Sequence, residues 1–434
     1  MRAETIFALS SGVGRAGVAV VRVSGPAVRS VLSTLLRRLV EPRKATLATV
    51  RDPEDGSPID QALVLFFPSP TSFTGEDIAE FHLHGSIAVV RRFLGLLGCR
   101  NDCRLAEAGE FTRRAFLSGK IDLLGVEGLS DMLAAETEMQ RRMAMEGSLW
   151  LRQAARTWRE RLIGLRAMAE AMLDFGDEGD VLDRLDSQTE QDIQQLAAEI
   201  GQATDRLKVG ERIRQGYRVA ILGPPNAGKS SLLNALADRD LAITSPIPGT
   251  TRDALEASID LDGLAVVLVD TAGLRDAPGD EIEAEGMKRS QKAARDADLV
   301  LWASPIDSPA ECSNASYHVV RTMADKAERR ADGGLAVSSQ TGQGLGELIA
   351  FIKAQALNGL EGVSLEKLVA HERQANSLLD ARRCLIESAR HGSVTLDIRA
   401  EELRAACHAL DALIGTVDHE DVLAAIFSRF CIGK

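Results

Sequence analysis

The spacing of apolar residues along the chain changes at three places. Up to about residue 118, the short β-like runs "GVAVVRVSG", "ALVLFFP" and "DIAEFHLHG" predict strands, and "AVRSVLSTLLRRL" predicts a helix between them. Long helical patterning follows as far as residue 212, for example in "TEMQRRMAMEGSLWLRQAARTWRERLIGLRAMAEAML". Alternating strand and helix patterns begin at residue 216, and long helical patterns return in the last part of the chain.

This order predicts a multidomain α/β and α+β fold with three domains. We expect an N-terminal α+β domain over 1–118, a helical domain in two parts over 119–212 and 359–434, and an inserted α/β domain over 216–358. The two helical parts should pack together, because each of their helices has an apolar stripe that needs cover.

Composition and charge narrow the class of protein. The 434 residues are 45% hydrophobic and 26% charged, which is typical of a soluble globular protein. A net charge of −12 argues against a protein that coats nucleic acid non-specifically, although it leaves room for a local basic surface. The six cysteines form no C-x-x-C pair, and no apolar run approaches the ~18 residues of a membrane span. Together with the lack of a signal-peptide pattern, this predicts a cytoplasmic protein with reduced thiols.

The inserted domain contains a phosphate-binding motif. After the predicted strand "YRVAILG", the stretch "GPPNAGKSS" (223–231) fits G-x-x-x-x-G-K-[ST] and leads into a helix. Backbone N–H groups of such a loop face phosphates, Lys229 reaches the β and γ oxygens, and the Ser230 hydroxyl can bind Mg²⁺. The alternative, a chance glycine-rich turn, is disfavoured by the strand before it and the helix after it.

Two further stretches indicate a nucleotide triphosphatase. "LAVVLVDTAG" (264–273) is a buried strand that ends in Asp270, which suits the Mg²⁺ shell, and Gly273 can approach a γ-phosphate. "PGTTRD" (248–253) lies where a switch threonine should bind Mg²⁺. Together these stretches resemble the translation-factor-like GTPases.

The base-recognition loop departs from the usual N-K-x-D. After the strand in "YHVVRTMADK", the chain has Thr322, Met323, Ala324 and Asp325. Asp325 can still accept hydrogen bonds from guanine N1 and N2. The usual bracing asparagine and base-covering lysine are absent, and Ser338, Ser339 and Gln340 replace the usual S-A-K. We therefore expect guanine to be preferred over adenine, with reduced GTP affinity.

The usual water-positioning and charge-stabilising groups are also missing. Leu274 follows the D-x-x-G motif, where many GTPases have a glutamine, and no arginine is obviously placed to stabilise the transition state. The carboxylates of "GDEIEAEG" can serve the helix N-terminus or orient water, and the sequence does not choose among them. Asn226 and the loop "TSPIPGTT" offer amide and carbonyl oxygens that suit a monovalent cation.

Long motifs at both ends of the chain resemble the MnmE (TrmE) family of tRNA-modification GTPases. The match covers nearly the whole chain and includes "ETIFALSSGVGRAGVAVVRVSGP", "SFTGEDIAEFHLHG", "RLAEAGEFTRRAFLSGKIDLLGVEGLSDML" and the final "FCIGK".

The resemblance implies specific site residues. GTP binding falls on Asn226, Ala227, Gly228, Lys229, Ser230, Ser231, Ser245, Pro246, Ile247, Pro248, Gly249, Thr250, Thr251, Asp270, Thr271, Ala272, Gly273, Asp325, Ser338, Ser339 and Gln340. The Mg²⁺ ligands fall on Ser230 and Thr251, and the K⁺ ligands on Asn226, Ser245, Ile247 and Thr250. The catalytic, water-orienting glutamate falls on Glu283, with Glu281 as a competitor because one residue is inserted before it. A 5-formyl-tetrahydrofolate site falls on Arg22, Glu80, Lys120 and Lys434.

The resemblance also implies a function. A homodimer, with the FAD-dependent partner MnmG (GidA), adds a (carboxymethyl)aminomethyl group to C5 of the wobble uridine of certain tRNAs. 5,10-Methylene-tetrahydrofolate would be the one-carbon donor. K⁺ would activate GTP hydrolysis when two GTPase domains dimerise across their switches.

Several alternatives stay open from the sequence. The chain could be a GTPase assembly factor with weakened guanine specificity, or a divergent copy that has lost efficient turnover. Glu80, His82 and His84 alternate on one strand and could form a metal triad, although no further ligand lies close in sequence. Cys431 could be a nucleophile or a small buried side chain.

Overall fold

The fold is described from a computed structural model of the chain. The residues it describes are 4–38, 40–174, 179–238, 256–270, 292–309, 312, 314, 316–326, 335–358, 360, 362–390, 396–415, 426–427, 430 and 433. No helix within these ranges combines the length and apolar character needed to cross a membrane. The chain divides into two compact units, Met1–Ser130 with Asp411–Lys434, and Asp131–Leu410, and each is described by itself.

The first unit is built on a six-stranded sheet. Its strands are β1 (Thr5–Leu9), β2 (Ala16–Ser24), β3 (Thr46–Arg51), β4 (Pro58–Phe67), β5 (Ile78–Gly85) and β6 (Cys103–Leu105). They lie in the order β3-β4-β5-β2-β1-β6, and every pair is antiparallel except β1 with β6. The three strands predicted from apolar runs are β2, β4 and β5, which confirms those predictions.

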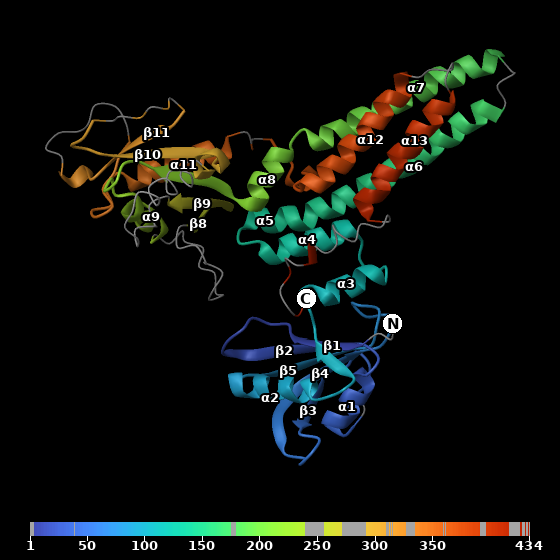
Figure 1. Cartoon of the computed structure of the whole chain (residues 1–434), viewed down its shortest axis with the longest axis vertical. Helices are drawn as coiled ribbons and strands as arrows, with labels where there is room; N and C mark the ends of the chain where they lie inside the picture. The colour runs from blue at the N-terminus through green and yellow to red at the C-terminus, as the bar shows by residue number, and fades with distance from the viewer. Residues whose placement is uncertain are drawn as a thin grey trace, which may run out of the picture. The chain divides into compact units, whose positions relative to one another are not determined.

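Alternate residues of each strand point to opposite faces of this sheet, and helices cover apolar side chains on both faces. Helices α1 (Val28–Leu36) and α2 (Ile87–Gly98) share one apolar cluster with the inward residues of β2 to β5 (Figure 1). On the other face, Ile6 and Ala8 of β1 pack against Phe111 of α3 (Glu110–Leu117). Phe427 and Phe430, from the far end of the chain, pack with Val126 of α4 (Leu123–Ala134).

The second unit contains a six-stranded α/β domain and a set of long helices. The strands are β7 (Tyr217–Leu222), β8 (Glu256–Leu261), β9 (Leu264–Asp270), β10 (Leu299–Pro305), β11 (His318–Thr322) and β12 (Leu335–Ala336). Their order is β12-β11-β10-β7-β9-β8, and all pairs are parallel except β8 with β9. Helices α9 (Lys229–Ala237) and α11 (Leu345–Leu357) contribute to the same apolar core. This is the P-loop α/β fold expected for the inserted domain.

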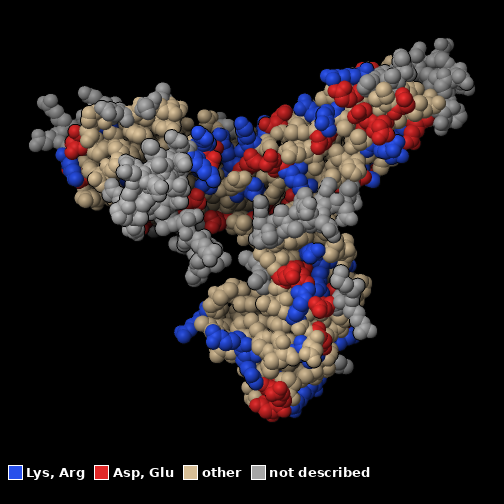
Figure 2. Space-filling model, viewed as in Figure 1, with Lys and Arg blue, Asp and Glu red and all other residues tan. Residues whose placement is uncertain are grey.

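The two helical parts predicted from the sequence do pack together. The described helices here are α5 (Glu138–Arg142), the π-helix η1 (Met143–Gly147), α6 (Ser148–Asp174), α7 (Gly179–Thr204), α8 (Leu207–Gln215), the 3₁₀ turn η3 (Leu365–Lys367), α12 (Glu372–Arg390) and α13 (Leu396–Ile414). Helix α7, before the inserted domain, packs along α12, after it (Figure 1). Acidic and basic side chains are mixed over the visible face of these helices (Figure 2). Arg166 and Glu170, one turn apart on α6, form one such ion pair.

The inserted domain enters and leaves the helical domain at neighbouring points. Gly210 of α8 lies so close to the later segment that a Cβ on it would be 2.2 Å from the Val369 carbonyl oxygen. Beside this contact, Arg214 Nε donates a 2.8 Å hydrogen bond to the carbonyl of Ala370. The helix start at Thr137 is fixed by a capping box with Gln140, whose amide also donates to Arg214 O.

Candidate functional site

The phosphate-binding loop joins β7 to α9 through a sharply turned backbone. Gly223 has φ 148°, and a Cβ there would lie 2.2 Å from the Ala303 carbonyl oxygen, so only glycine fits. Asn226 and Gly228 also have positive φ, and Gly228 caps α9. The first N–H groups of α9 have no partner within the helix, so the loop is an anion site.

Lys229, the first residue of α9, is positioned over this loop. Its side chain is buried, and its ammonium donates to the carbonyls of Gly223 and Pro224 at 3.0 and 2.9 Å. A nucleotide phosphate at the loop would therefore meet a cation that is already in place. Ser230 and Ser231, the next two residues, are exposed at the same helix start.

Asp270 lies beside the loop at the end of β9. Parallel pairing places Asp270 opposite Ile221 of β7, and the carboxylate is 5% exposed. The carboxyl edge of a parallel sheet is where such folds bind ligands. The remaining residues expected around the γ-phosphate lie outside the described residues: Ser245, Pro246, Ile247, Pro248, Gly249, Thr250, Thr251, Thr271, Ala272, Gly273, Glu281 and Glu283.

The base-recognition loop is held by side-chain hydrogen bonds. Ser338 Oγ donates a 2.5 Å bond to Asp325, and this bond lowers the pKa of the Asp325 carboxyl. The Thr322 hydroxyl, which is buried, donates a 2.7 Å bond to the Ala227 carbonyl in the phosphate loop. Ser339 is half-buried and Gln340 is exposed at the turn that follows. Sequence reasoning missed the Thr322 bond, since the only signal was a hydroxyl where an asparagine is usual.

In the first unit, two of the expected folate residues form an ion pair. Arg22 of β2 and Glu80 of β5 face each other in the antiparallel register, and their side chains are 2.9 Å apart. Both are partly buried, at 24% and 17% side-chain exposure. Such a pair can offer a carboxylate to ring N–H groups and a guanidinium to an anionic or carbonyl group.

Two aromatic rings flank Arg22. The Phe73 and Phe111 ring centres each lie 5.7 Å from the guanidinium carbon. Phe73 comes from the loop before β5 and Phe111 from α3. Both rings lie within the long motifs "SFTGEDIAEFHLHG" and "RLAEAGEFTRRAFLSGKIDLLGVEGLSDML", where the aromatic residue itself is the only sequence signal for a stacking role.

The remaining expected folate residues come from two other segments. The Lys120 side chain lies near Gly75, where a Cβ would be 3.4 Å from Lys120 Cε. Lys434 and Cys431 lie outside the described residues. Their neighbour Gly433 is described, and its carbonyl accepts a 2.9 Å hydrogen bond from the Ser10 hydroxyl.

Of the alternating histidines, His84 is hydrogen-bonded to a carboxylate, whereas His82 Nε2 is buried without a hydrogen-bond partner among the described residues. His84 Nδ1 lies 2.7 Å from Asp60, and His82 Nε2 lies 3.7 Å from Glu80. Among the described residues there is no group of three or more side chains placed to hold a metal ion.

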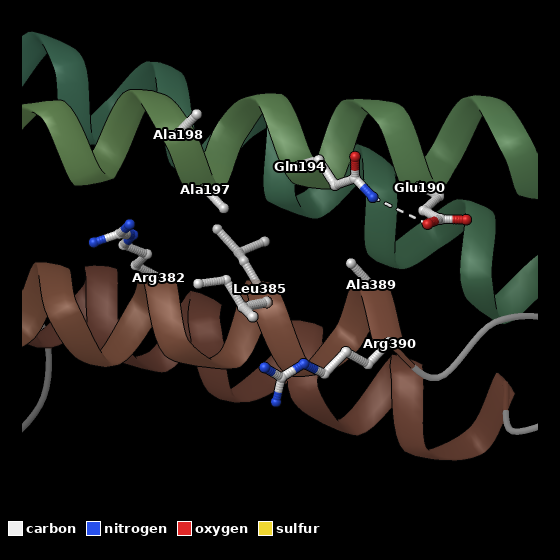
Figure 3. A pocket seen from close by; sticks show the side chains of 9 residues that line it. Glu190, Gln194, Ala197, Ala198, Arg382, Leu385, Ala389 and Arg390 are labelled. Atoms are coloured by element: carbon white, nitrogen blue, oxygen red, sulfur yellow. Dashed lines mark hydrogen bonds between the residues drawn. The ribbon is translucent and has the colours of Figure 1, made fainter.

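A groove of about 580 Å³ lies between α7 and α12 (Figure 3). Small and apolar side chains such as Ala197 and Leu385 line its centre, and Arg382 and Glu190 lie towards its ends. The hydrogen bond drawn there joins Gln194 to Glu190, both on α7, at 3.0 Å. The groove marks the junction of the two helical parts.

Comparisons with known proteins match this arrangement. The family profile "GTP-binding protein TrmE N-terminus" matches residues 5–120, and "MnmE helical domain" matches residues 123–431. A protein named tRNA modification GTPase MnmE from Beijerinckia indica subsp. indica is 48% identical, covering 99% of this chain and 96% of its own. A second with that name, from Methylobacterium sp. (strain 4-46), is 46% identical and covers 99% and 100%.

Among solved structures, the G domain of the T. maritima FeoB iron transporter is 25% identical. It covers 33% of this chain and 97% of its own, with a TM-score of 0.23, and at that score the likeness carries no argument. The family profiles and the full-length relatives establish the family of the chain. The chain belongs to the MnmE (TrmE) family of tRNA modification GTPases, and it is a GTP-hydrolysing enzyme of tRNA modification.

Proposed function

We propose that this enzyme adds a (carboxymethyl)aminomethyl group to C5 of the wobble uridine of certain tRNAs, together with the FAD-dependent partner MnmG. A tetrahydrofolate would bring the one-carbon unit, and GTP hydrolysis would drive the rearrangement. The observation that carries the proposal is the Arg22–Glu80 pair between Phe73 and Phe111.

The side chains around Arg22 fit the chemistry of a folate. A flat pterin ring carries N–H donors along one edge, which a carboxylate such as Glu80 can accept. Its faces suit stacking on Phe73 or Phe111. Lys120 near Gly75 and Lys434 beyond Gly433 would meet the carboxylates of the folate tail.

The GTPase side of the proposal rests on the phosphate loop. Lys229 would contact the β and γ phosphates, and Ser230 with Thr251 would hold Mg²⁺. Asn226, Ser245, Ile247 and Thr250 would hold K⁺, and Glu283 would orient the attacking water. Mg²⁺ and K⁺ would supply the positive charge that phosphoryl transfer requires.

A homodimer is supported by the outer face of the N-terminal sheet. Val18, Leu47 and Leu63 expose 54%, 60% and 38% of their surface, and strand register brings them to the face that carries Glu80 and His82. A second copy packed on this face would cover the apolar side chains and enclose the Arg22–Glu80 pair.

Nucleoside analysis of tRNA tests the proposal directly. Cells that lack the chain should lose the modified wobble uridine and regain it with the intact protein. Arg22→Met should fail to restore it while keeping potassium-stimulated GTP hydrolysis, whereas Lys229→Ala should lose both.

Two results would count against this proposal. Full modification by Arg22→Met would remove the folate assignment. Equal GTP hydrolysis in sodium and potassium would remove the K⁺ site. In the same assay, Cys431→Ser decides whether that thiol takes part in the modification chemistry.

A further inference from the structure

The loop after β11 connects the two ends of the nucleotide site. Asp325, which would read the base, lies three residues after Thr322, which is bonded to the phosphate loop at Ala227. Thr322 is 2% exposed and Ala227 is fully buried, so this 2.7 Å bond is shielded from water. It therefore holds the loop after β11, which carries Asp325, at a fixed distance from the phosphate loop.

Further bonds hold the loop in one shape. Ala324 N–H donates to the Val337 carbonyl at 3.0 Å, and Val337 N–H donates to the Arg321 carbonyl at 2.7 Å. The buried Arg321 guanidinium donates to Ser304 Oγ at 2.8 Å. The loop is thus held to β10 and to the segment after β12 where it approaches the phosphate loop.

Met323 has an unusual backbone conformation within this loop. Its φ is 59°, a left-handed value that a long side chain rarely adopts. Its methyl carbon lies 3.8 Å from the position of a Cβ on Gly228, and Lys326 Nζ lies 3.7 Å from its sulfur. The thioether side chain therefore lies beside the phosphate loop at Gly228.

We infer that Thr322 and Met323 rebuild the guanine site that the altered T-M-A-D motif otherwise lacks. Thr322 is a positioning residue, and its hydroxyl replaces the bracing amide of the usual asparagine. Met323 covers one face of the guanine base in place of the usual lysine stem, with Lys326 bringing a cation to its sulfur. This inference rests on the proposed nucleotide site and names two of its specificity-determining residues.

Thr322→Val tests the brace, because it removes the hydroxyl and keeps the shape. GDP binding to the full chain, followed with a fluorescent guanine nucleotide, should weaken roughly tenfold. Thr322→Ser should restore it, and Thr157→Val, on the exposed face of α6, should bind like the unchanged protein. The ratio of GDP to IDP affinity should also fall in Thr322→Val, because IDP lacks the amino group that Asp325 reads.

Met323→Ala tests the cover over the base. GDP affinity should fall about fivefold, while Met323→Leu should keep most of it because an apolar side chain remains. Met168→Ala is the matched control, since Met168 is an exposed methionine on α6. Unchanged GDP affinity in Met323→Ala would overturn the role of this side chain.

Asp325→Asn separates failure of the inference from failure of the site. If Asp325→Asn loses GDP binding but Thr322→Val and Met323→Ala do not, the site stands and the inference is wrong. A Thr322→Val defect that Thr322→Ser does not rescue also overturns the brace. If Asp325→Asn binds GDP normally, the proposed base site itself fails.

Discussion

The hydroxyl of Ser10 donates a 2.9 Å hydrogen bond to the carbonyl of Gly433, across 423 positions of the chain. Ser10 follows β1, in which Ala8 is paired with Arg22. Gly433 has φ 104°, and a Cβ there would lie 2.2 Å from the Leu9 carbonyl oxygen. Gly433 therefore lies against the strand pair that carries Arg22, which accounts for the glycine at this position of "FCIGK".

Gly433→Ala should displace this segment, because the added methyl cannot fit against Leu9 and alanine disfavours the positive φ. We expect binding of 5-formyl-tetrahydrofolate, measured by calorimetry, to weaken at least roughly tenfold. GDP affinity should not change. Gly95→Ala is the control, since a Cβ on Gly95 meets nothing within 4 Å. Normal folate binding by Gly433→Ala would show that the segment does not shape the pocket.

Phe73→Leu should weaken folate binding by removing a ring beside Arg22. Loss of an aromatic stacking contact typically costs about 1 kcal/mol, or several-fold in affinity. Phe67→Leu is a matched control, because Phe67 lies 5.8 Å from the Arg43 guanidinium in a similar contact elsewhere in the sheet. The same calorimetric titration measures both, and equal affinities of the two variants would contradict a role for Phe73.

Protonation of the Glu110 carboxylate should make the N-terminal unit less stable in acid. Burial raises the pKa of its carboxyl, but hydrogen bonds from Arg104, the Glu107 N–H and Arg114 outweigh it and lower the pKa from 4.5 to about 2. The charged form is thus favoured by folding, so its stabilisation is complete above pH 4.5 and is lost as the pH falls towards 2. Since Glu110 begins α3, this network also positions Phe111.

Glu110→Gln measures that contribution. At pH 7 the variant should unfold with a free energy about 1–3 kcal/mol smaller, because two arginines lose a charged partner. The deficit should shrink between pH 4.5 and pH 2 in urea titrations. Glu41→Gln, which affects an exposed pair with Lys44, should show little effect at any pH. A deficit that stays constant with pH would refute the electrostatic explanation.

Cys103 should react slowly with alkylating reagents. Burial, with Asp102 as a hydrogen-bond acceptor, raises the pKa of its thiol to about 11, so little reactive thiolate forms at pH 8. Cys99 is exposed and should be labelled first. Mass spectrometry of peptides from timed iodoacetamide reactions measures both rates, and the Cys103 rate should rise as the pH approaches 11. Equal rates at pH 8 would be inconsistent with this environment.

Much of the architecture could be predicted from apolar spacing and loop motifs. The "GPPNAGKSS" loop, the strand ending at Asp270 and the pairing of the two helical parts all follow from local patterns. The aromatic contacts of Arg22 could not, because they depend on the β2–β5 register and on loops from distant segments. The Thr322 bond is of the same kind, since it joins residues 95 positions apart.

The touching backbones of Gly210 and Val369 have a mechanical consequence. The two connections between the helical domain and the inserted domain lie side by side at this contact, so a rotation of the inserted domain would move α8 and the segment after η3 at the same time. A movement caused by nucleotide turnover would then reach the parts of the helical domain before and after the insertion together, and not one part independently of the other.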